Sequence, residues 1–158
     1  MVRVLMIFCL IFLVALGVHY RPTQNFDYSS PANAVQTVNG LTKVNFDFLG
    51  GYRYEGEKDI PPTVKELDGK RVEIKGFMLP IDFDGAVVTS FMLMSTQAGC
   101  CFGVIPRDNE FVYAEFPKGK STKFLIDVPL NVTGVLHIGR DTLVGGVYSM
   151  TVESVRKD

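Results

Sequence analysis

Short runs in which apolar and polar residues alternate begin at Lys70 and continue almost to the end of the chain. In the first run, residues 72–75 read valine, glutamate, isoleucine, lysine, the period of a half-buried β-strand. Glycine or proline punctuates the runs, and Asp84-Gly85 is a typical hairpin turn. The later runs span residues 87–94, 110–116, 131–138 and 147–155. Five short strands without a strong helix between them predict a mainly β domain, a small antiparallel barrel or sandwich.

The apolar N-terminal segment indicates where the chain is delivered. Val4 to Val18 contains no charged residue, and Arg3 gives it a weakly basic start. A helix of that length rises only about 22 Å, which is less than the roughly 30 Å of a bilayer's hydrocarbon core. Ala15 and Gly17 offer a cleavage site, so residues 1–20 are predicted to be a signal peptide. An uncleaved membrane anchor and a buried soluble helix are the alternatives. With a signal peptide or an anchor, the rest of the chain is exported, periplasmic or anchored to the cytoplasmic membrane facing outward.

The chain between this segment and the strands is more polar. Residues 21–55 are predicted to be a linker and an N-terminal arm, followed by the barrel domain over residues 56–158. Ser30-Pro31 favours a short helix that runs through Val38 and stops at the next glycine. Residues 41–54 alternate loosely, which is typical of a strand or of an arm laid over the domain. Two prolines open a helical turn that a glycine ends within residues 61–69.

Charge and motifs narrow the function. Lys and Arg number 16 and Asp and Glu 17, so the net charge is −1 and there is no basic surplus of the kind that nucleic-acid binding requires. The chain contains no GxSxG, GxxxxGK, HExxH or CxxC motif. We therefore expect neither a nucleic-acid partner nor an enzyme.

The most unusual stretch joins the second and third predicted strands and contains two adjacent cysteines, Cys100 and Cys101. Two glycines and a proline bracket the pair, so the backbone is expected to bend there and to form a binding loop. The other candidate residues of this loop are Gly99, Phe102, Gly103, Pro106, Asn109 and Glu110.

Three interpretations of the cysteine pair stay open. The cysteines are small buried hydrophobes, or they bind a zinc or copper ion or do redox chemistry, or they form a disulfide. For a metal site His137 would supply an imidazole, and a closed zinc site would add a carboxylate (Asp82, Asp84 or Glu110) or a partner chain. A disulfide between neighbours would be strained, because consecutive α-carbons lie only about 3.8 Å apart.

Each supporting residue has a simpler explanation. A lone histidine such as His137 on a strand is typical of a surface or barrel-mouth position. Asp82 and Asp84 flank a turn, where aspartate is favoured by its backbone contacts. The triplet that begins at Asn131 matches a glycosylation acceptor but opens a predicted strand, so we discount it.

The chain contains four further motifs: Ile60-Pro61-Pro62, Leu67-Asp68-Gly69-Lys70-Arg71-Val72, Gly76-Phe77-Met78-Leu79-Pro80 and Cys100-Cys101-Phe102-Gly103 with Pro106, Asn109 and Glu110. Together they resemble DUF3299, a domain of unknown function found in exported bacterial proteins. The resemblance covers about residues 46–155 and implies a small OB-like barrel and an envelope location, without an activity. Some relatives carry a histidine shortly after the cysteine, and this chain does not. The family's settings imply an envelope transporter or other membrane protein as a partner.

Three functions follow as hypotheses. The first is an accessory or ligand- or metal-binding module of the cell envelope, with the Cys100-Cys101 loop as its functional surface. The second is a thiol-redox protein or metallochaperone that uses the two cysteines. The third is a structural subunit of an envelope transport complex, in which the cysteines are only packed.

Overall fold

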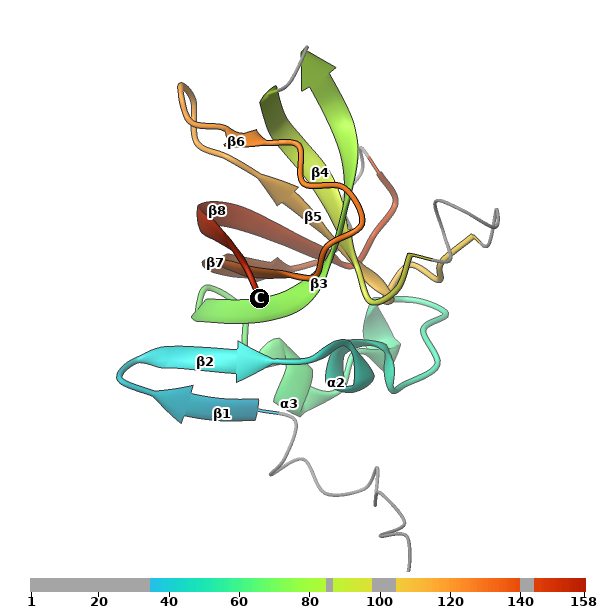
Figure 1. Ribbon diagram of the computed structural model, residues 1–158. Coiled ribbons are helices and arrows are strands. Elements are labelled where there is room, and N and C mark those ends of the chain that lie inside the picture. Colours follow the sequence, from blue (N-terminus) through green and yellow to red (C-terminus); the bar gives the residue numbers. More distant parts are fainter. Residues whose placement is uncertain (1–34, 85–86, 98–104, 140–143) are drawn as a thin grey trace, which may run out of the picture.

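The computed structural model describes residues 35–84, 87–97, 105–139 and 144–158. A barrel of five strands forms its centre (Figure 1). These strands are β3 (Arg71–Asp84), β4 (Val87–Met94), β5 (Phe111–Glu115), β7 (Leu130–Ile138) and β8 (Tyr148–Lys157). They correspond to the five predicted runs, and each of them buries apolar residues in the core. The predicted mainly β fold is confirmed.

The strand order makes the barrel OB-like. The ladder runs β3-β7-β8-β5-β4, and pairing of β4 with β3 closes it. Four of these five pairings are antiparallel, whereas β5 and β8 are parallel. This is the five-stranded Greek-key order of the OB-fold. A pairing between strands so distant in the sequence brings the start of β5 beside the start of β8.

One long strand turns the corner of the barrel. The first half of β3 pairs with β7 up to Gly76, and its second half pairs with β4 from Phe77 onward. At Gly76 the backbones approach closely, since a Cβ built there would lie 2.6 Å from the carbonyl oxygen of Met94. The glycine is therefore required by space at the point where the strand changes partner.

The barrel interior is filled by aliphatic and aromatic side chains from every strand. Ile74, Phe91, Val112, Leu136 and Met150 are all at most 2% exposed. Burial of each such side chain stabilises the fold by about 1.5–3 kcal/mol before the entropy of ordering is counted.

A hairpin that was not predicted pairs with the edge of β3. Its strands are β1 (Val35–Val38) and β2 (Leu41–Val44), and β2 pairs with β3 in parallel (Figure 1). The helix predicted through Val38 is therefore wrong over residues 35–38, and its first residues lie outside the described part of the chain. The turn residues Asn39 and Gly40 have φ values of 52° and 76°, which is the type I′ turn that Asn-Gly favours.

Short helices connect the hairpin to the barrel. These are α2 (Phe46–Gly50), the 3₁₀ turn η2 (Glu57–Asp59) and α3 (Pro62–Lys65). Asn45 caps α2, because its Oδ1 accepts a hydrogen bond of 2.9 Å from the Phe48 amide. The predicted turn after Pro61-Pro62 is confirmed as α3. The prediction of a strand or arm for residues 41–54 holds for β2, but α2 was missed. A two-residue strand, β6 (Thr122–Lys123), pairs with β4.

The predicted signal peptide or anchor, residues 1–20, lies outside the described residues. Within the part that the structure describes, no helix has the length and apolar character to cross a membrane.

Candidate functional site

The predicted binding loop joins β4 to β5, and the structure describes it from Ile105 onward. Gly99, Cys100, Cys101, Phe102 and Gly103 lie outside the described residues. Ile105 is 91% exposed. Pro106 is partly buried, whereas Asn109 is completely buried and Glu110 half-buried. The described end of the loop thus passes from an exposed apolar residue into a polar, well-packed base.

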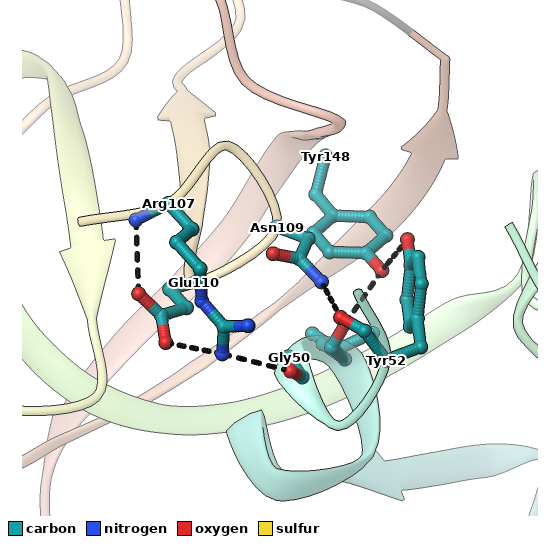
Figure 2. A network of polar contacts seen from close by, with 7 residues as sticks. Gly50, Tyr52, Arg107, Asn109, Glu110 and Tyr148 are labelled. Carbon is teal, nitrogen blue, oxygen red and sulfur yellow. Dashed lines mark hydrogen bonds and ion pairs between the residues drawn. The ribbon is translucent and has the colours of Figure 1, made fainter. Parts of the chain in front are cut away.

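An ion pair joins Arg107 and Glu110 within this base. Arg107 Nη2 lies 2.6 Å from Glu110 Oε1, and the Arg107 amide donates to Glu110 Oε2 at 2.9 Å (Figure 2). Arg107 Nη2 also donates to the Gly50 carbonyl oxygen at 3.2 Å, so the pair reaches the end of α2. The hydrogen bond from the Arg107 side chain lowers the pKa of Glu110, and the same contact raises the pKa of Arg107. Both groups therefore stay charged at neutral pH.

Asn109 fixes the base from inside. Its side chain is 0% exposed, and Nδ2 donates to the Tyr52 carbonyl oxygen at 2.8 Å (Figure 2). Its Oδ1 is buried and has no hydrogen-bond partner among the described residues. The residue before it, Asp108, accepts through its backbone carbonyl oxygen a hydrogen bond of 2.9 Å from the amide of Val147, just before β8. Contacts from two other parts of the chain therefore hold these two residues.

A tyrosine pair supports the segment that Asn109 contacts. Tyr148 donates through its hydroxyl to the Leu49 carbonyl oxygen at 2.8 Å, and the hydroxyls of Tyr52 and Tyr148 are 2.8 Å apart (Figure 2). Because Tyr148 gives its only proton to Leu49, Tyr52 is the donor between the two hydroxyls. Burial is the main cause that raises the pKa of both tyrosines. Both phenols therefore stay neutral and keep these bonds at physiological pH.

We call the residues joined by these contacts the loop clamp: Leu49, Gly50, Tyr52, Arg107, Asp108, Asn109, Glu110, Val147 and Tyr148. Beside it lies a cavity of about 190 Å³ lined by α2 residues, Ser95, Arg107 and Glu110. Ser95 directly follows β4 and Arg107 precedes β5, so the two ends of the β4–β5 connection meet at this cavity. The clamp fixes where that connection re-enters the barrel at β5.

His137 stands apart from the loop clamp in its contacts. It is exposed on β7, its Nε2 lies 3.4 Å from Thr151 Oγ1, and it lines another cavity. Within the described residues no cluster of three or more histidine, cysteine, aspartate or glutamate side chains could hold a metal ion. Because Cys100 and Cys101 are outside that part, their proposed site with His137 stays a prediction.

Two other residues singled out in the sequence make local contacts. Asp82 lies within β3 and accepts a hydrogen bond of 2.5 Å from Thr89 Oγ1 on the paired strand β4. The side chain of Asp84 lies outside the described part. Asn131, near the start of β7, donates to Asp158 at 3.0 Å.

The loop clamp contains several residues that the sequence did not single out. Tyr52 and Tyr148 are 96 positions apart, and no local pattern connects them. Arg107 could have been found, because it stands three residues before Glu110, a spacing that allows an ion pair across one turn. Its contact with Gly50 depends on α2, which was not predicted.

The ion pair predicts a pH effect. Glu110→Gln should lower the free energy of unfolding at pH 7 by about 1 kcal/mol, because the carboxylate is partly exposed and water screens it. The pKa of Glu110 is lower in the folded state, so its stabilisation is present above the unfolded pKa, about 4.3, and is lost as the pH falls below it. Urea unfolding followed by circular dichroism from pH 7 to acid pH measures the difference in the free energy of unfolding between wild type and variant. This difference should shrink as the pH falls.

The control is Glu55→Gln, which removes the exposed ion pair of 2.7 Å with Arg53. Its effect at neutral pH should be close to zero. A Glu110→Gln variant that tracks this control at every pH would show that the loop-clamp pair contributes nothing.

A closed five-stranded barrel with a clamped connection between its second and third strands defines the class of this fold, an OB-like barrel. The chain matches the model for the protein family of unknown function DUF3299 over residues 32–157, and it belongs to that family. A crystal structure of a DUF3299 family protein from Pseudomonas aeruginosa PAO1 has a similar fold, with a TM-score of 0.54 and 19% identity. The match covers 73% of this chain and 95% of that one. A search of the curated proteins finds no match.

Proposed function

We propose that the protein is a non-catalytic, ligand-binding accessory module of the bacterial cell envelope, and that the β4–β5 connection with Cys100 and Cys101 is its binding surface. The loop clamp is the observation that carries this proposal. A connection that only joins two strands needs no buried asparagine and no buried tyrosine hydroxyl, each of which costs free energy unless it is hydrogen-bonded. Such a base is useful where the residues that it supports must be held in place.

The chemistry of the connection suggests its ligand. Thiolates bind soft or borderline ions such as copper or zinc. Both carboxylate oxygens of Glu110 already accept hydrogen bonds from Arg107, so this carboxylate is committed to the clamp. We therefore propose the two thiols as the principal donors, with the remaining ligand supplied by His137 or by a partner protein.

An exported location fits this role. The apolar segment from Val4 to Val18 supports a signal peptide or anchor, which would place the barrel in the periplasm or on the outer side of the cytoplasmic membrane. A partner there would be a transporter or another membrane protein. Ile105, four residues after Cys101, is 91% exposed and would lie against such a partner.

Elemental analysis tests the proposal. The full chain is expressed in a bacterial host, recovered from the envelope fraction and purified without chelators. We expect close to one zinc or copper ion per chain, lost in Cys100→Ser/Cys101→Ser and retained in the matched Cys9→Ser variant. Wild-type protein without a stoichiometric ion would contradict metal binding.

Thiol titration with and without reductant separates the alternatives. Two thiols that react only after reduction, without a bound ion, would favour the thiol-redox function instead. Two thiols that react only after denaturation would favour the structural-subunit function.

A further inference from the structure

A second cavity lies on the outer face of the barrel and shares no residue with the loop clamp. Its volume is about 300 Å³. Strand register explains how it is built, since Tyr113 on β5 pairs with Ser149 on β8, which pairs with His137 on β7. In the adjacent row Glu115 pairs with Thr151. Directly paired residues point to the same face of a sheet, so these five side chains form one surface.

The segment that follows β5 completes the cavity. Phe116, Pro117 and Lys118 line it together with the strand residues. Phe116 and Tyr113 are each only 9% exposed, and Phe116 packs against Phe91 in the core, whereas Pro117 is exposed. The cavity therefore combines a rigid sheet floor with the apolar ring of Pro117 at its wall.

Six of the nine lining residues have polar side chains: Tyr113, Glu115, Lys118, His137, Ser149 and Thr151. Three of them carry hydroxyl groups, which can both donate and accept a hydrogen bond. The imidazole of His137 can donate at one nitrogen and accept at the other. The carboxylate accepts and the ammonium group donates. This set matches a ligand that presents several hydroxyl groups in different directions.

Charge and ligand chemistry disfavour the other ligand classes. One carboxylate and one ammonium group leave the cavity without net charge when His137 is neutral, so it offers no field for a phosphate or another strongly charged anion. Only Glu115 and His137 among the described lining residues are common metal ligands, too few for a closed site. The polar majority also disfavours an acyl chain.

We propose that this outer-face cavity binds one ring of a sugar. The sugar's hydroxyl groups would bond to Ser149, Thr151 and Glu115, and its C–H face would lie against the apolar ring of Pro117. A volume at the lower end of the range for small-molecule pockets suits a single ring. The role differs from that of the β4–β5 connection and does not depend on the cysteines.

Nuclear magnetic resonance tests the proposal on the full chain in detergent micelles, or on whichever form the host secretes. The probes are glucose, N-acetylglucosamine and N-acetylchitotriose, each titrated to millimolar concentration. We expect the amide resonances of Tyr113, His137, Ser149 and Thr151 to shift with sugar. Equal shifts with monosaccharide and trisaccharide indicate a free sugar, and tighter binding of the trisaccharide indicates a glycan chain.

Variants localise the site. Ser149→Ala/Thr151→Ala should weaken sugar binding roughly tenfold, because two hydrogen bonds are lost, and Glu115→Gln tests the acceptor without changing shape. Ser154→Ala on the same strand is exposed outside the cavity and should bind like wild type. Sugar shifts that persist in the double variant, shifts caused by inorganic phosphate alone, or no shift with any sugar would each overturn the proposal.

Discussion

Replacing Asn109 with alanine is expected to lower the free energy of unfolding by about 3 kcal/mol. The side chain is completely buried, and its hydrogen bond to the Tyr52 carbonyl oxygen links the β4–β5 connection to the segment after α2. Alanine leaves that carbonyl oxygen without this donor and leaves a polar-lined void that neighbouring side chains cannot fill without moving. Urea denaturation followed by circular dichroism measures the change.

Asn131→Ala is the matched control. This asparagine donates a hydrogen bond of 3.0 Å to Asp158 at the surface, so its loss should cost less than about 1 kcal/mol. If both variants cost the same, Asn109 has no special part in fixing the loop. If Asn109→Ala is folded at low temperature, its affinity for zinc or copper should also fall, because the base of the connection is looser.

The second large effect is expected for Gly76→Ala, which should lower the free energy of unfolding by about 3 kcal/mol. The added Cβ would lie 2.6 Å from the Met94 carbonyl oxygen and 3.0 Å from the Leu93 side chain. Either β3 or β4 must move, and the barrel closes through this pair of strands. Thermal unfolding monitored by circular dichroism should show the loss as a lower midpoint.

Gly56→Ala provides the comparison, because a Cβ at Gly56 would meet nothing within 4 Å and the backbone is extended there. Its effect should stay within about 0.5 kcal/mol. A Gly76→Ala variant as stable as this control would mean that the corner of β3 has more room than the structure indicates.

Local pattern was enough to place the barrel strands. In β8 the alternation follows directly from having one face in the core, whereas β5 is buried along almost its whole length. The parallel pairing of β5 with β8 could not be read in the same way, because it depends on contacts between segments far apart in the chain. The step from a barrel or sandwich to an OB-like barrel came from the family motifs.

The β1–β2 hairpin was missed although its signal was present. Asn39-Gly40 is a strong hairpin turn between residues with β-branched side chains, but Pro31 and a later glycine were interpreted as the start and end of a helix. A helix through Val35, Thr37 and Val38 would have placed three β-branched residues where their side-chain freedom is most restricted. The turn chemistry was the better guide.

The candidate site was predicted in part. Asn109 and Glu110 were chosen as loop residues, and the structure gives both of them defined contacts at the base of the loop. Tyr52 and Tyr148 come together only because α2 and the start of β8 pack against each other, and hydroxyl pairing leaves no trace in local sequence. The cysteines and their immediate neighbours lie outside the described residues, so their role rests on the experiments above.

The position of β1–β2 has a mechanical consequence. The chain enters the described fold at Val35, on the outermost strand of the sheet, and only three residue pairs join β2 to β3, with one ion pair of 3.3 Å between Lys43 and Glu73 beside them. Tension from any tether before Val35 would therefore peel the hairpin away first, while the closed barrel keeps all of its own ladders. In a tethered chain the hairpin would therefore act as a strain-relief segment ahead of the barrel.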